Sequence, residues 1–196
     1  MMKKITIVTF THVERGTVTD QLAGHLYRTG CLGRIICFSY RAGDVPDRFY
    51  ATPPFRFFYF LPWRICEVLA RSTDLSVRNF RERLFDFFVS RSSALRNADT
   101  VVFRKPNFLR SLTVCRKRGI RTYVMASILH PGFHLQQAER ESKRLGVDSS
   151  ATDLDANRAQ RISKSFEVCD FILSFSPLSN RIFREYGLPK KKLIFV

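Results

Sequence analysis

The sequence predicts an α/β fold with a Rossmann-like, doubly wound, mostly parallel sheet and helices on both faces. Short runs of β-branched and aromatic residues alternate with helix-like segments along most of the 196 residues. The first forty residues follow the order strand, helix, strand, which implies parallel pairing through a right-handed crossover. With 45% hydrophobic residues the chain can bury a core, so we expect a single Rossmann-like domain over residues 1–196.

Local patterns predict the opening elements. A β-branched run over residues 4–10 is typical of a buried parallel strand. Apolar residues recur at four-residue spacing over 17–29, which predicts a helix, and Gly30 stands where its C-cap would lie. The next strand is predicted over 34–40.

The alternation stops at residue 41 and resumes near residue 76. Prolines and aromatics fill the segment 41–75, which we interpret as an insertion. A helix is predicted over 76–97, where four apolar side chains share one face: Phe80, Leu84, Phe87 and Phe88. The remaining expected elements are strand 99–103, helix 107–118, strand 120–126, helices 133–145 and 153–168, strand 171–175, helix 178–186 and strand 192–196.

The charge balance points to an acidic partner. The chain has 33 Lys and Arg against 17 Asp and Glu, a net charge of +16. Neither a signal peptide nor an 18-residue apolar segment is present, and the five scattered cysteines are typical of reduced, mostly buried thiols in a cytosolic chain. No His and carboxylate pair has metal-ligand spacing, so no metal site is predicted.

Two loops are candidates for ligand binding. Arg15, Gly16 and Thr17 lie between the first strand and the first helix, where a helix N-terminus faces anions; a solvated turn is an equal alternative, and the GxGxxG and P-loop patterns are absent. His130 directly follows a strand, which suits a ligand contact, although a structural hydrogen-bonded histidine fits as well.

The segment 49–63 is unusually aromatic. Eight of its fifteen residues are Phe, Tyr or Trp, and arginines punctuate it. Rings and cations together favour a membrane interface, so we expect an anionic membrane surface to contact five residues: Arg56, Phe57, Phe58, Trp63 and Arg64. A hydrophobic cluster packed beneath a loop is the alternative.

Three stretches carry a resemblance to a known family. They are residues 167–176, where Glu and Asp precede a strand that ends in Ser; residues 181–196, a helix, turn and strand; and the Ser-x-x-His-Pro loop over 127–131, with the helix 137–146 after it. Together they resemble the amino-terminal domain of retaining family 4 (group 1) glycosyltransferases, which have the two-domain GT-B fold. The family's Gly-Gly turn is reduced here to Gly16.

The resemblance implies transfer of a sugar from a nucleotide-sugar donor to a glycan or lipid-linked acceptor, at the cytoplasmic face of the membrane. It implies that His130 contacts the donor sugar, and that Arg15, Gly16, Thr17, Ser127 and Ser176 bind substrate. The nucleotide sugar is expected mainly on a carboxy-terminal donor domain absent from this chain, so no cofactor is expected here and the chain alone is expected to be inactive.

A different class stays open as an alternative. A basic, non-catalytic module for a polyanion or nucleic acid would also explain the net charge of +16. The basic residues are dispersed, and no RRM, KH, zinc-finger or basic-zipper signature is present, which disfavours nucleic acid.

Overall fold

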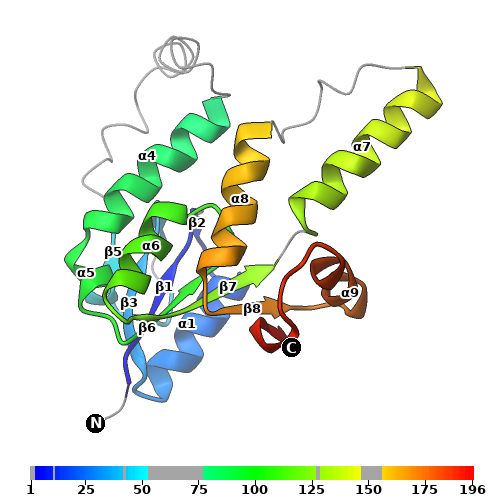
Figure 1. The fold of residues 1–196 in the computed structure, drawn as a ribbon. Coiled ribbons are helices and arrows are strands. Elements are labelled where there is room, and N and C mark those ends of the chain that lie inside the picture. Colours follow the sequence, from blue (N-terminus) through cyan, green and yellow to red (C-terminus); the bar gives the residue numbers. More distant parts are fainter. Residues whose placement is uncertain (1–2, 11, 42, 53–76, 127–128, 147–155) are drawn as a thin grey trace.

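The computed structural model describes residues 3–10, 12–41, 43–52, 77–126, 129–146 and 156–196 (Figure 1). Their main feature is a seven-stranded sheet in the order β5-β3-β1-β6-β7-β8-β9, in which every pair is parallel. The strands are β1 (Ile5–Val8), β3 (Leu32–Ile36), β5 (Tyr50–Ala51), β6 (Thr100–Phe103), β7 (Arg121–Ala126), β8 (Phe171–Ser174) and β9 (Leu193–Phe195). The strand order reverses between β1 and β6, which makes their carboxyl ends the topological switch point of the sheet.

Helices cover both faces of the sheet. The described helices are α1 (Val18–Arg28), α4 (Val77–Arg91), α5 (Ser93–Arg96), α6 (Leu109–Lys117), α7 (Pro131–Leu145), α8 (Ala156–Val168) and α9 (Pro177–Glu185), with short 3-10 turns at Asp47–Phe49 and Lys190–Lys192. In Figure 1, α4, α6 and α8 lie side by side on one face, and α1 lies on the other. The predicted Rossmann-like, parallel α/β fold is therefore confirmed.

Two hydrophobic clusters form the core, one for each face. The larger cluster joins β6, β7 and β8 to the α4, α6 and α8 layer and includes the fully buried rings of Phe103, Phe108 and Phe166. The smaller one joins β1 and β3 to α1 around Ile7 and Ile35. Because both faces are covered, the strands are apolar on both sides, as the sequence pattern indicated.

Most predicted elements are found within a few residues of the expected bounds. The segment 34–40 is different, because its strand ends at Ile36 and Ser39–Tyr40 (β4) pairs instead with His12–Val13 (β2) in a separate two-stranded sheet. The short strand β5 lies in the segment where no regular pattern was visible. Two residues are too few for a periodicity to appear.

The predicted helix over 76–97 is two helices. The chain turns at Ser92, whose Oγ accepts a hydrogen bond from the Ala94 amide and caps α5. The apolar residues that share one face of α4, such as Phe80 and Leu84, are only half-buried. The buried face instead carries polar groups, Glu82 and Asp86 among them, because α8 and α6 supply their partners.

The cysteines within the described ranges are free thiols, as expected. Cys37, Cys115 and Cys169 are buried, and burial raises the pKa of each thiol to about 12. Among the residues that the structure describes, no helix has the length and apolarity to cross a bilayer.

Candidate functional site

The carboxyl edge of the sheet gathers several of the predicted site residues. The loop with Gly16 precedes α1, His130 follows β7, and Ser176 follows β8. In an open parallel sheet, ligands bind beyond the carboxyl ends of the strands, near the switch point. The fold therefore places these three positions along one edge of the sheet.

The Gly16 loop is closed by its own side chains. Gly16 has φ of +82°, and its amide donates a hydrogen bond to the Asp20 carboxylate at 2.9 Å. Thr17 is the N-cap of α1: its Oγ1 accepts from the Asp20 amide and donates to the Glu14 carbonyl. Arg15 is exposed. The amide of Gly16, a residue expected to bind substrate, is thus held by Asp20, which the Thr-x-x-Asp capping spacing could have indicated.

His130 is a buried cap at the start of α7. Its Nδ1 accepts a hydrogen bond from the Gly132 amide at 3.2 Å, which leaves the ring proton on Nε2. The ring stacks on Tyr186 with centroids 4.3 Å apart and also meets Phe166 and Phe183. Burial lowers the pKa of His130 to about 4, so the imidazole is neutral near pH 7. It can donate a hydrogen bond from Nε2, but it carries no charge there.

Tyr186 is a partner of His130 that the sequence reasoning missed. It lies at the end of α9, and its hydroxyl donates to Gln136 Oε1 on α7. A Cβ at Gly132 would lie 2.5 Å from Tyr186 Cε1, so the tyrosine ring requires a glycine there. Two helices distant in sequence therefore hold the histidine ring in place.

Ser176 is also a capping residue. Its Oγ accepts from the Ser179 amide at the start of α9, and its carbonyl accepts from the Ser174 hydroxyl. The other predicted site residues lie outside the described ranges: Ser127, Arg56, Phe57, Phe58, Trp63 and Arg64. Their roles stay predictions.

Two cations at the end of β6 were counted in the sequence only as dispersed charge. Arg104 and Lys105 are half-buried and directly follow the strand. Burial lowers the pKa of Arg104. Burial also lowers the pKa of Lys105, the positive charges of Arg78 and Arg158 add to that effect, and Glu82 opposes it.

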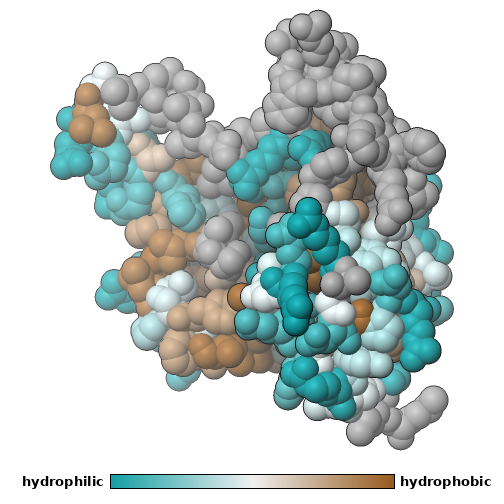
Figure 2. Space-filling model, turned by 180° about the vertical axis from the view of Figure 1, so that it is seen from behind, coloured by the Kyte–Doolittle hydropathy of each residue, from teal (hydrophilic) through white to brown (hydrophobic). Residues whose placement is uncertain are grey.

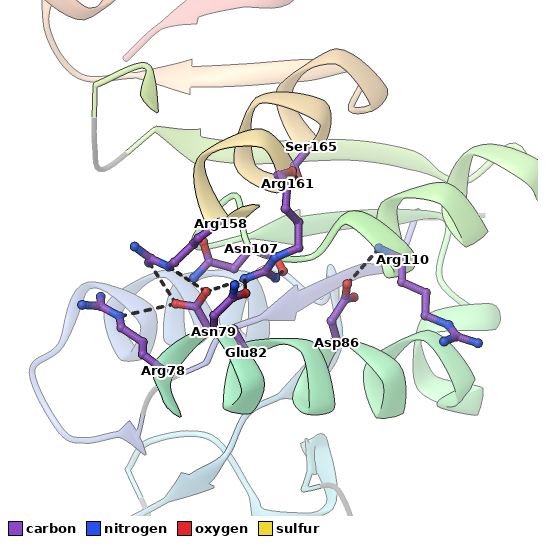
Figure 3. Close-up of polar contacts among 9 residues, drawn as sticks. All are labelled: Arg78, Asn79, Glu82, Asp86, Asn107, Arg110, Arg158, Arg161 and Ser165. Atoms are coloured by element: carbon purple, nitrogen blue, oxygen red, sulfur yellow. Dashed lines mark hydrogen bonds and ion pairs between the residues drawn. The ribbon is translucent and has the colours of Figure 1, made fainter. Parts of the chain in front are cut away.

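A buried ion network joins α4 to α8 (Figure 3). Glu82 on α4 binds Arg158 at 2.9 Å and Arg161 at 2.6 Å, both on α8. Arg161 also donates to Asn79 Oδ1 and to the Asn107 carbonyl. One carboxylate thus serves two buried guanidinium groups, and the network fixes α4 to α8.

Asp86 has a similar structural role, and it lies about a turn beyond Glu82 on α4. Its carboxylate accepts from the Arg110 and Ser111 amides and from the Ser111 hydroxyl, so it caps the N-terminus of α6 (Figure 3). Burial raises the pKa of Asp86, and these hydrogen bonds act in the opposite direction. The anion position at α6 is therefore occupied by a side chain of the protein itself.

A hollow of about 680 Å³ lies at the opposite, amino edge of the sheet, between α6 and β8. Its polar groups hold the fold together. Asp170 accepts from the amide and hydroxyl of Thr122, and Lys192 donates to the carbonyls of Glu167 and Cys169. We therefore place the candidate site at the carboxyl edge. Among the described residues, no group of three His, Cys, Asp or Glu could hold a metal ion.

No model of a known protein family matches the sequence, and no curated protein does. The fold is similar to that of TcCGT1 in complex with UDP, with a TM-score of 0.55 and 12% identity over 100% of this chain. The fold overlaps less well with the UDP-GlcNAc 2-epimerase from Methanocaldococcus jannaschii, with a TM-score of 0.48 and 9% identity over 98% of this chain and 45% of that chain. For the lipopolysaccharide outer core galactosyltransferase WaaB, the TM-score is 0.45 and the identity 11%, over 97% of this chain and 44% of that chain.

The likeness to TcCGT1 shows a shared Rossmann-like fold. This chain spans about half the length of the structures it matches, 51% in the case of TcCGT1. None of the comparisons singles out family 4, which stays a prediction.

An apolar surface lies over α9 and β9 (Figure 2). It consists of Phe175, Leu178, Phe195 and Val196, whose side chains are between 46% and 65% exposed. β9 is also the edge strand of the sheet. Because large exposed apolar patches mark contact surfaces, this one is a candidate contact surface.

Proposed function

We propose that this chain is the acceptor-side half of a retaining glycosyltransferase, which moves a sugar from a nucleotide-sugar donor to a glycan or lipid-linked acceptor. The observation that carries the proposal is the match of the whole chain to about half of TcCGT1, a structure that contains UDP. The carboxyl edge of the sheet supports it, since His130 and the Gly16 loop lie where such folds bind ligands.

In the proposed reaction the residues of this chain position the reactants. The neutral His130 would donate from Nε2 to a hydroxyl of the donor sugar, because its Nδ1 is engaged with Gly132. The Gly16 amide would meet a phosphate oxygen after the Asp20 carboxylate turns away from it. Positioning and stabilisation of the leaving diphosphate would supply most of the rate enhancement.

Most donor contacts would come from a second Rossmann-like domain. The exposed apolar surface over α9 and β9 is available to pack against it. The aromatic and basic segment within 41–75 would dock the enzyme on the cytoplasmic face of an anionic membrane, where each Lys or Arg near the surface contributes about 1 kcal/mol.

Sugar transfer by this chain and by the protein with its second domain tests the proposal. Residues 1–196 should fold and transfer no sugar, whereas the longer protein should transfer sugar from a nucleotide donor. In the longer protein, His130→Asn should lower kcat about tenfold or more, because asparagine keeps the cap of α7 and removes the Nε2 donor. Turnover by residues 1–196 alone, or full activity of the variant, would contradict the proposal.

Flotation with vesicles tests the membrane role separately. The chain should float with phosphatidylglycerol vesicles, and Ser replacements of Phe57, Phe58 and Trp63 should weaken that binding. Unchanged flotation would assign these rings to internal packing.

The net charge of +16 supports one other candidate, a non-catalytic polyanion-binding module. Such a module would bind duplex or single-stranded nucleic acid more tightly than anionic vesicles, with a steep salt dependence. Measuring both affinities at two salt concentrations separates the two functions.

A further inference from the structure

Arg104 stands at the switch point of the sheet. Its amide donates to the Val8 carbonyl at 2.9 Å, which ties the residue after β6 to the end of β1. Lys105 follows it and is also half-buried. Two cations therefore border the place where ligands of doubly wound sheets bind.

The Arg104 guanidinium has a weak acceptor. Among the described residues, its side-chain hydrogen bond is to Met125 Sδ, with Nη1 and sulfur 3.3 Å apart. A thioether is a poor acceptor, whereas a guanidinium suits the oxygens of phosphate or carboxylate. A half-buried arginine whose acceptor is a thioether can therefore form stronger hydrogen bonds with the oxygens of an anionic ligand.

The surroundings of Lys105 carry more positive than negative charge. The charged side chains that act on Lys105 are three cations and one anion. The cations are Arg78, Arg104 and Arg158, and the anion is Glu82. Glu82 is already engaged by Arg158 and Arg161, and lies 3.5 Å from Arg78. Positive charge concentrated in a half-buried place attracts an anionic ligand.

We propose that Arg104 and Lys105 bind a phosphate group of the acceptor. A planar arginine fork suits the oxygens of phosphate, and the lysine next to it in the sequence adds a second positive charge. That the phosphate belongs to an acceptor rests on the proposed function. That these residues bind phosphate rests on this chain alone. The phosphate would belong either to a water-soluble sugar phosphate or to a lipid.

Phosphate binding to the 196-residue chain tests this, with no nucleotide sugar present. Inorganic phosphate serves as the soluble probe, followed by calorimetry, and phosphatidylcholine vesicles with and without phosphatidic acid serve as the lipid probe. Arg104→Gln and Lys105→Gln should each weaken binding about tenfold or more. The matched controls are Lys117→Gln and Arg118→Gln. Both residues are exposed at the carboxyl end of α6, and each substitution removes one positive charge, as Lys105→Gln and Arg104→Gln do.

Loss of phosphate binding in solution assigns a soluble acceptor, and loss confined to vesicles assigns a lipid-linked one. Equal losses in the control pair, or none in either variant, would overturn the site. Displacement of the bound phosphate by UDP would assign these cations to the donor and overturn the proposal as well. This binding experiment does not measure sugar transfer. Phosphate binding by residues 1–196, together with no sugar transfer by the longer protein, would therefore contradict the proposed function and leave the phosphate site standing. Arg104→Lys serves as a second variant if the glutamine variant does not fold.

Discussion

His130 is an uncharged ring enclosed by aromatic side chains from two helices, with Phe166 on α8 and Phe183 and Tyr186 on α9. It is only 8% exposed, and the cause of its lowered pKa is burial. A protonated ring would lose hydration without gaining a carboxylate in exchange. The residue therefore favours the neutral state in the folded chain.

This arrangement makes stability depend on pH. The unfolded histidine binds a proton below its ordinary pKa of 6.5, and the folded one only below about 4, so acid between these values favours the unfolded state. Between pH 7 and pH 5 we expect this residue to lower the free energy of unfolding by about 2 kcal/mol. Urea unfolding at both pH values measures it. The change with pH should shrink in His130→Asn; an identical change would show that His130 does not titrate in this way.

At the scale of elements, α4 and α8 are joined through polar groups rather than through an apolar seam. Glu82 receives hydrogen bonds from Arg158 and Arg161, while Asp86 caps α6. Buried charges are tolerated only where they are paired and hydrogen-bonded. The helix layer over this face of the sheet is therefore held by specific partners.

Glu82→Gln should break this junction. It removes the charge shared by two buried guanidinium groups, so we expect a loss of about 3–5 kcal/mol in the free energy of unfolding. Chemical denaturation measures the loss. Glu139→Gln on α7 is the matched control, because its pair with Lys143 is exposed to solvent and should contribute little to stability. Similar losses in both variants would mean that burial of the network adds nothing.

At the scale of the molecule, a strongly basic surface coexists with an exposed apolar one. The net charge of +16 keeps copies of the chain apart, whereas the surface over α9 and β9 favours association. Salt screens the repulsion and leaves the apolar attraction. The balance between them should decide whether the chain is monomeric.

Sedimentation velocity at raised salt should therefore detect self-association of residues 1–196. Leu178→Ser together with Phe195→Ser should reduce it, because these side chains are 46% and 59% exposed within the patch. Leu145→Ser is the control, since Leu145 is 62% exposed at the carboxyl end of α7, the end that points away from α9 (Figure 1). If the control reduces association as much as the pair, the α9 and β9 surface is not the contact.

Several elements were visible in the sequence because their signals are local. The strands β6 and β7 are short runs in which β-branched and aromatic residues are frequent, and α1 begins at a capping threonine and is followed by Gly30. The order of these elements is enough to place the Gly16 loop and His130 at one edge of a parallel sheet. The strand β5 could not be predicted from the sequence, because it is two residues long and forms through its pairing with β3.

The alternation of strands and helices can be read from the sequence, and with it the fold class, the basic charge and the sheet edge at which the candidate site lies. The tertiary structure alone decided which side chains are free to act there. His130 is neutral because Tyr186 and Phe183 enclose it, and Glu82 is occupied because Arg158 reaches it from 76 residues away. Such contacts depend on how helices pack across the sheet, and no periodicity along the chain records them.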